Sequence, residues 1–73
     1  MRYPDGSEAR LGDRPQIFGG ECGRIVASMD TDEYSEEFPK RDWAYLREGI
    51  MVETDQGALV HLDGAHSENV TRL

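Results

Sequence analysis

The chain is predicted to belong to the all-β class, as a small, curled barrel of five strands. Two glycine clusters, Gly12 and Gly19-Gly20-x-x-Gly23, lie between short apolar runs, where glycine permits tight corners between strands. Several segments alternate apolar and polar residues, as strands with one buried face do. The length of 73 residues suits one domain with one core. Residues 1–73 are therefore expected to form a single barrel with an acidic insertion loop and one short helix.

The first two strands are expected in the N-terminal part of the chain. Residues 8–11 alternate, and a second strand is expected over residues 14–18 with Ile17 in the core. Pro15 has no amide hydrogen to donate, which confines this second strand to a sheet edge or a strand start. The inward residues of the first strand are expected to be Ala9 and Leu11.

The longest strand is predicted over residues 22–29. Strict alternation would divide its side chains between two faces of a sheet. One face would carry Ile25, Ala27 and Met29, and the other Arg24, Val26 and Ser28.

Alternation stops over residues 30–40, which are predicted to form a long acidic excursion with room for one helical turn. A short helix is expected next, over residues 42–46, because the carboxylate of Asp42 can accept free amide hydrogens at a helix start. Gly49 would end it.

A β-hairpin is predicted over residues 50–54 and 58–62, with Gly57 in the left-handed position of a bulged turn. Alternation places five residues on its core face: Ile50, Val52, Ala58, Val60 and Leu62. The opposite face would carry Met51, Glu53, Leu59 and His61. The polar tail reaches Val70 and Leu73, which either close the barrel as a last strand or fray.

The segments Leu11-Gly12-Asp13-Arg14 and Gly23-Arg24-Ile25-Val26 are similar to the Gly-Asp-x-Val and Gly-x-Val-Val rhythm of KOW-type barrels. This resemblance implies an SH3-like barrel fold. Pro15 stands where that family has an apolar strand residue, and the basic nucleic-acid surface of KOW domains is absent. The resemblance therefore implies the fold and not the family's usual function.

Three further segments resemble short bacterial proteins of unassigned role. They are Tyr3-Pro4-Asp5-Gly6, Arg10-Leu11-Gly12-Asp13, and Trp43-Ala44-Tyr45-Leu46 together with Glu53-Thr54. This second resemblance implies no activity.

The charge of the chain bears on its partners. A net charge of −7 repels phosphate backbones, and no basic cluster longer than Lys40-Arg41 offsets it. Nucleic acid is therefore not expected as a partner, whereas a basic protein or peptide would be attracted. Acidity that merely keeps a small domain soluble is the alternative interpretation.

The compartment is inferred from cysteine usage and hydropathy. Cys22 is the only cysteine, so no internal disulfide can form, which fits a reducing compartment. No apolar run approaches the ~20 residues that span a bilayer, and the first residues do not resemble an export signal. A soluble, cytoplasmic protein with no membrane partner is expected.

The candidate site combines the acids of the excursion with the rings in and after it. Flat rings beside carboxylates can bind a basic or proline-containing peptide in a groove. Alternatively, Trp43 and Phe38 close an open end of the barrel as core residues. The predicted partner-binding residues are Asp30, Asp32, Glu33, Tyr34, Glu36, Glu37, Trp43 and Tyr45.

No metal site, cofactor or catalytic residue is predicted. The alternate positions Asp30, Asp32, Tyr34 and Glu36 suit the start of a calcium loop, but Ser35 stands where glycine is required and Arg41 where glutamate is. The soft ligands Cys22, His61 and His66 lack the paired spacing of zinc sites. His61 is expected on an outward strand face, held by a neighbour such as Glu53.

The sequence thus predicts a noncatalytic protein-binding module that binds a basic protein or peptide. One alternative is an acidic inhibitor or immunity-type protein that blocks a basic enzyme cleft. The other is a self-associating structural subunit that dimerises through a hairpin edge or through an apolar patch of Met51 and Leu59, unless the excursion covers that patch.

Overall fold

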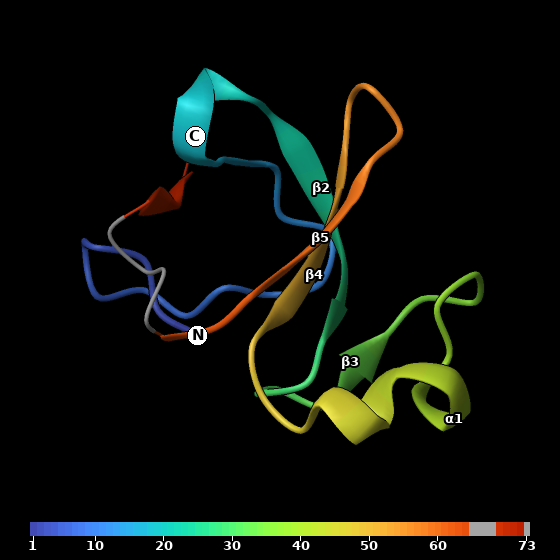
Figure 1. The fold of residues 1–73 in the computed structure, drawn as a ribbon. Helices are drawn as coiled ribbons and strands as arrows, with labels where there is room; N and C mark the ends of the chain where they lie inside the picture. Colours follow the sequence, from blue (N-terminus) through green and yellow to red (C-terminus); the bar gives the residue numbers. More distant parts are fainter. Residues whose placement is uncertain (65–68, 73) are drawn as a thin grey trace.

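The structure is a computed structural model that describes residues 1–64 and 69–72, without the side chain of Phe18. Its centre is a four-stranded antiparallel sheet with the order β3-β2-β4-β5, and a two-stranded ladder joins β1 to β6 (Figure 1). The strands are β1 (Pro15–Gln16), β2 (Gly23–Ser28), β3 (Glu33–Tyr34), β4 (Ile50–Thr54), β5 (Leu59–Leu62) and β6 (Thr71–Arg72). The helices are α1 (Lys40–Trp43) and the 3-10 turns η1 (Phe18–Gly20) and η2 (Ala44–Leu46).

The regular structure is mostly strand, as predicted for the all-β class, but the described residues form no closed barrel. Strands β3 and β5 end the larger sheet, and neither pairs with β1 or β6 in the described part of the chain. The strands β1, β3 and β6 have two residues each, which is too short to carry a continuous ladder around a barrel. Residues 1–64 and 69–72 contain six short strands in two sheets, so the prediction of five strands is not confirmed.

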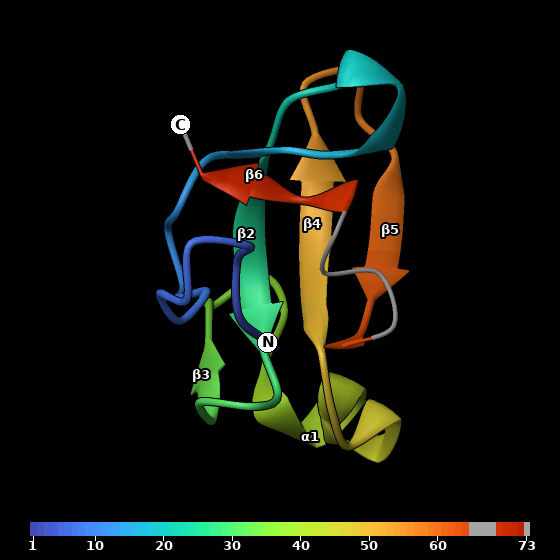
Figure 2. The same cartoon turned by 90° about the vertical axis from the view of Figure 1, so that its left-hand side faces the viewer.

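The larger sheet has an apolar cluster on each face. The N-terminal segment and β6 lie across one face, and α1 lies beyond the other (Figures 1 and 2). The first cluster contains Met1, Tyr3, Ala9, Ile17, Ile25, Ile50, Val52, Leu62 and Val70. The second contains Val26, Ala27, Met29, Phe38 and Met51, with Tyr34, Trp43 and Leu46 packed against it. The excursion thus supplies a second apolar cluster beside the single core that was expected, and Phe38 and Trp43 take part in it, in line with the alternative of core residues.

A β-bulge at Val26 explains how β2 serves both clusters. Ile25 lies opposite Val52 and Ala27 lies opposite Met51, so Val26 is an additional residue in the ladder. Val26 and Ala27 both join the second cluster, whereas Ile25 joins the first. The prediction that Ile25 and Ala27 share a face is wrong, because the bulge interrupts the alternation on which it depended.

The N-terminal segment is a tight loop. Instead of a strand over residues 8–11, it contains one isolated bridge between Arg2 and Glu8, because the chain turns back at Gly6 with φ of +90°. The Ala9 amide donates to the Met1 carbonyl at 2.8 Å, and Ala9 is fully buried as expected.

The expected second strand is shorter than predicted. β1 spans only Pro15 and Gln16 and pairs with β6, which agrees with an edge position for Pro15. Ile17 is buried, and Val70 is buried just before the short last strand. Leu73 lies outside the described residues.

The predicted hairpin is confirmed as β4 and β5, with Gly57 at φ of +89° in its turn. Its core face holds Ile50, Val52 and Leu62, while Val60 is half-buried and Ala58 exposed. Met51 lies on the opposite face, as predicted, and the second cluster covers it and leaves it 5% exposed, which is the alternative of a patch covered by the excursion. Leu59, on the same face, is 43% exposed.

The excursion is more ordered than a loop. It contains β3, which pairs with β2, and an isolated bridge between Ser35 and Phe38. The helix begins at Lys40, so the prediction that Asp42 caps it is wrong: Pro39 is the N-cap residue and Asp42 lies in the first turn. Pro39 provides the extended backbone that precedes a helix.

The connection from η2 to β4 requires glycine at position 49. The chain leaves η2 through Arg47 at φ of +67° and then passes Gly49 at φ of +91°. A Cβ atom at Gly49 would lie 2.2 Å from the carbonyl oxygen of Leu62. The residue that ends the helical segment is therefore not Gly49 as predicted but Arg47, its C-cap residue, and glycine is needed at position 49 for close packing against β5. Among the described residues, the longest helix is far too short to cross a bilayer.

Candidate functional site

Two of the predicted partner-binding carboxylates are held in ion pairs within the chain. Asp30 and Glu8 accept hydrogen bonds from the terminal ammonium of Met1, with 2.9 Å between that nitrogen and the Glu8 carboxylate. Burial opposes the ammonium charge, but the two carboxylates outweigh it and raise the pKa of the terminal amine. Asp32 pairs with Lys40 at 2.9 Å on the exposed surface.

Glu33 joins the N-terminal segment to the excursion. Its carboxylate accepts from Arg10 Nε at 2.8 Å, from Arg10 Nη2 at 2.9 Å and from Thr31 Oγ1 at 2.7 Å. The Leu11 amide donates to the same carboxylate at 3.3 Å. The Arg10 guanidinium, followed by the Thr31 hydroxyl, lowers the pKa of Glu33 to about 2. This clamp holds Leu11 beside the excursion.

Glu36 and Glu37 are different from the other three acids. Both are exposed, and neither forms an ion pair with any residue that the structure describes. They follow β3 at the point where the excursion leaves the sheet edge. Their carboxylates are therefore available to a ligand.

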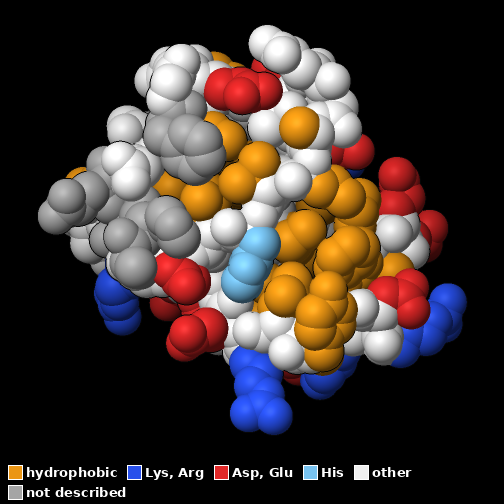
Figure 3. All heavy atoms as spheres, viewed as in Figure 1, with side chains coloured by type: hydrophobic (Ala, Val, Ile, Leu, Met, Phe, Trp, Pro, Cys, Tyr) orange, Lys and Arg blue, Asp and Glu red, His pale blue; other side chains and the backbone are white. Residues whose placement is uncertain are grey.

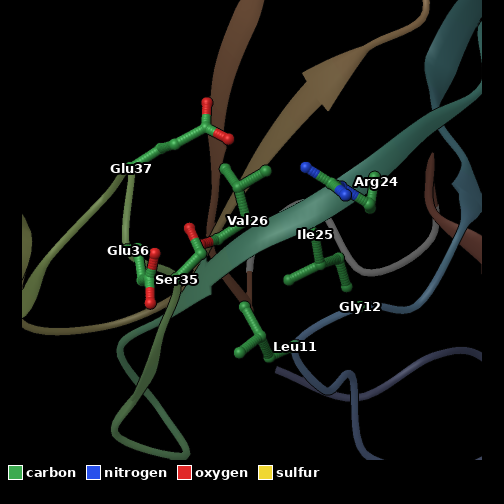
Figure 4. A pocket seen from close by; sticks show the side chains of 8 residues that line it. All are labelled: Leu11, Gly12, Arg24, Ile25, Val26, Ser35, Glu36 and Glu37. Carbon is green, nitrogen blue, oxygen red and sulfur yellow. The ribbon is translucent and has the colours of Figure 1, made fainter.

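These two acids line a groove of 250 Å³ at the outer edge of β2. Its apolar lining residues are Leu11, which is half-buried, and Ile25 and Val26, which are each 1% exposed; Ser35, Gly12 and Arg24 complete the lining. Figure 4 shows Arg24 and Glu37 flanking Val26, with Leu11 and Ile25 on the other side of the strand. Arg24 is exposed and has no ion-pair partner in the described part of the chain. The groove thus combines the accessible apolar side chain of Leu11 with charges of both signs.

Backbone hydrogen bonds already occupy the β2 edge that borders this groove. The Ile25 amide donates to Asp13 O at 2.9 Å, and the Ile25 carbonyl accepts from the Gly12 amide at 3.0 Å. The Val26 carbonyl accepts from the Ser35 amide at 3.2 Å and from the Ser35 hydroxyl at 2.7 Å. The groove walls are therefore fixed to its floor.

The predicted aromatic residues form a row that is separate from the groove lining. Phe38 is buried and its ring lies 5.8 Å from that of Trp43, which stacks on Tyr45 at 6.5 Å between centroids. Tyr34 and Trp43 are half-buried against the second cluster, and Tyr45 is 71% exposed. Phe38 and Trp43 thus act as a cover, whereas Tyr45 is available to a partner.

An exposed apolar surface accompanies this row. Figure 3 shows hydrophobic side chains gathered beside His61 and over the part of the molecule where α1 lies. Among the described residues two large hydrophobic side chains are exposed, Tyr45 and Leu59, whereas Met51 is covered.

The soft metal ligands do not assemble in the described residues, where no group of three His, Cys, Asp or Glu side chains is placed to hold a metal ion. Cys22 is half-buried. His61 is exposed, as expected, but its Nε2 lies 2.9 Å from the Glu48 carbonyl oxygen rather than near Glu53. His66 lies outside the described residues.

The sequence analysis did not identify Leu11, Gly12 or Arg24 as site residues. They enter the groove because the Glu33 clamp and the Gly12 hydrogen bond bring two distant segments to one strand edge. Comparison of the chain with protein-family models, with curated proteins and with solved structures finds no match.

Proposed function

We propose that this protein is a noncatalytic binding module that captures a basic protein or peptide in the groove beside Glu36 and Glu37. The observation that carries the proposal is the division of the acids. Asp30, Asp32 and Glu33 are engaged within the chain, whereas Glu36 and Glu37 are free among the described residues and border a concave apolar surface.

Attraction over distance and contact at the groove have different sources. The net charge of −7 draws a cationic partner toward the protein, and this attraction weakens as salt screens it. At contact, the methylenes of a Lys or Arg side chain can cover Leu11 while the cation reaches a carboxylate. Electrostatics then governs the association rate, and the groove governs the position of the ligand.

The shape of the groove favours this function over that of an inhibitor. An inhibitor that blocks a basic cleft presents its carboxylates on a protruding surface, whereas Glu36 and Glu37 border a concavity. A concave surface receives a side chain of the partner. Tyr45 extends the proposed contact region outside the groove, because its ring is 71% exposed.

The test is a titration of the ¹⁵N-labelled protein with peptides that carry one internal lysine. We expect amide shifts at Gly12, Arg24 and Ser35, and weaker binding as NaCl rises from about 50 to about 300 mM. The E36Q/E37Q double variant should weaken binding about tenfold. The E21Q/E48Q variant changes the net charge equally and should retain affinity. Equal losses in the two variants, or shifts that avoid the groove, would refute the proposal.

Self-association is a second candidate function, favoured by the exposed apolar side chain of Leu59 on the hairpin. Strand β5 also pairs with β4 alone among the described strands, and its backbone edge can pair with a second copy. Sedimentation at several concentrations distinguishes the two functions: a stable dimer that L59S dissolves supports self-association, and a monomer at all concentrations contradicts it.

We further propose that the two sheets are an open variant of an SH3-like barrel, and that the protein acts in the cytoplasm. Two observations support the fold proposal. The β1 and β6 ladder crosses over β2 and β4 (Figure 2). Gly12 has φ of +89°, and a Cβ atom at Gly23 would lie 2.6 Å from Val52 Cγ1, so glycine is required at both corners of the KOW-like segments.

A further inference from the structure

We infer that the groove binds the last residue of a partner chain that ends in Lys or Arg, with the basic side chain at Glu36 and Glu37 and the free α-carboxylate at Arg24. This inference rests on the proposed function and specifies the ligand of the same groove. Three features of the described residues carry it: the distribution of charge, the size of the groove, and the occupied strand edge.

The charge distribution calls for a ligand of mixed sign. Glu36 and Glu37 line the groove from the excursion, and Arg24 lines it from β2. Each of the three is exposed, and none has an ion-pair partner among the residues that the structure describes. A purely cationic ligand would meet Arg24 as a like charge. A C-terminal Lys or Arg carries a cation and a carboxylate on one residue and complements both walls.

The size of the groove limits the ligand to about one residue. Small-molecule sites usually have volumes of roughly 300–1,000 Å³, and the 250 Å³ groove lies below that range. The half-buried Leu11 can contact the methylene stem of a long basic side chain, whereas Ile25 and Val26 are each only 1% exposed. A single terminal residue fills this space without requiring a longer cleft.

The strand edge excludes the common alternative of strand addition. An extended peptide would need the outer backbone groups of β2, but Ile25 bonds to Gly12 and Asp13, and the Val26 carbonyl accepts twice from Ser35. Recognition therefore depends on side chains at the groove. A C-terminal residue can be recognised by side chains alone. Its basic side chain makes one contact, and its α-carboxylate makes a second contact in place of backbone hydrogen bonds to β2.

The experiment compares four peptides by shift mapping and calorimetry on the full chain. The first is acetyl-Gly-Ser-Gly-Lys with a free carboxylate, and the second is the same peptide as an amide. The third ends in glutamine with a free carboxylate, and the fourth carries an internal lysine and an amide end. The protein variants are R24Q and the matched control R41Q, which removes an exposed arginine in α1.

We expect the free-carboxylate lysine peptide to bind the wild type about three- to tenfold more tightly than its amide. In R24Q this ratio should fall below about twofold, and in R41Q it should persist. The glutamine peptide should bind about tenfold more weakly than the lysine peptide. Dispersed amide spectra of R24Q show that the variant is folded.

Several outcomes would overturn the inference, and they separate it from the proposed function. Equal binding of acid, amide and internal-lysine peptides at the groove would refute the inference and leave the proposed function standing. A carboxylate preference that persists in R24Q would likewise refute it, since Arg24 would then not be the contact. Absence of groove shifts with every lysine peptide would refute both.

Discussion

The sharpest structural prediction concerns Met51 and Leu59, which lie on the same face of the hairpin. Alternation alone makes them equivalent, but Met51 is 5% exposed and Leu59 is 43% exposed. The difference arises because Phe38 and its neighbours in the second cluster cover one and not the other. We expect Met51→Ala to be strongly destabilising and Leu59→Ala to be nearly neutral.

The magnitudes follow from burial. Truncating a buried methionine to alanine costs about 2–5 kcal/mol, since it removes apolar contact and leaves a cavity. A domain of 73 residues has a free energy of unfolding of roughly 4–11 kcal/mol. A loss of about 3 kcal/mol would lower Tm by about 12–24 °C in a chain of this size. For Leu59→Ala we expect a loss of about 1 kcal/mol or less.

The assay is urea unfolding followed by far-ultraviolet circular dichroism and by the fluorescence of Trp43, the only tryptophan. The midpoint should fall sharply for Met51→Ala with the slope m unchanged, and the two probes should coincide. Trp43 fluorescence reports directly on the second cluster, against which this side chain packs.

Similar losses of less than about 1 kcal/mol in both variants would refute the reasoning. That result would mean that the excursion does not cover the outer face of the hairpin. An early transition in Trp43 fluorescence would instead mean that the second cluster unfolds separately from the sheet.

Three further predictions test the clamp, a close backbone contact and a buried hydroxyl. The pKa of Glu33, about 2, lies below its ordinary 4.5, so its contacts with Arg10 stabilise the fold above pH 4.5 and are lost as the pH falls toward 2. Urea unfolding should show that E33Q destabilises at pH 7 and that the difference from wild type shrinks with acid; a constant difference would contradict this. Gly49→Ala should cost about 3 kcal/mol or more, because of the 2.2 Å approach to Leu62 O and the positive φ, and an unchanged thermal melt would contradict it. Ser28 Oγ is buried without a hydrogen-bond partner among the described residues, so Ser28→Ala should be neutral or stabilising by about 1 kcal/mol, and a clear loss in urea titration would count against that reading.

The hairpin was predictable from sequence because its information is local. Alternation over Ile50 to Thr54 and Leu59 to Leu62, with Gly57 between, specifies two strands and a turn without reference to the rest of the chain. The need for glycine after the helical segment is local in the same way, although the C-cap residue with positive φ is Arg47 and not Gly49. These features depend on neighbours in sequence.

The bulge and the second cluster were not predictable in this way. A bulge at Val26 leaves no mark on the alternation of Arg24, Ile25 and Ala27, because it is set by the register with β4. The burial of Met51 depends on where the excursion packs, which is a tertiary property. Helix capping at Asp42 failed because Pro39 started the helix earlier.

The candidate site was predicted in composition but not in geometry. The sequence shows which side chains are acidic, but not that Glu33 is engaged by Arg10 while Glu36 is free in the described part of the chain. Residues separated by 22 positions, Leu11 and Glu33, are joined by a hydrogen bond. Arg24 lines the groove together with Glu36 and Glu37, and it became a site residue only because the N-terminal segment and the excursion meet beside β2.

The additional residue in β2 has a consequence for how the groove arose. Deleting Val26 would leave Ile25 opposite Val52 and Ala27 opposite Met51, so the ladder with β4 would become regular and keep its partners. The same deletion would remove the carbonyl that holds Ser35 and part of the apolar lining. One additional residue therefore separates a regular ladder from the interrupted ladder beside which the concavity lies.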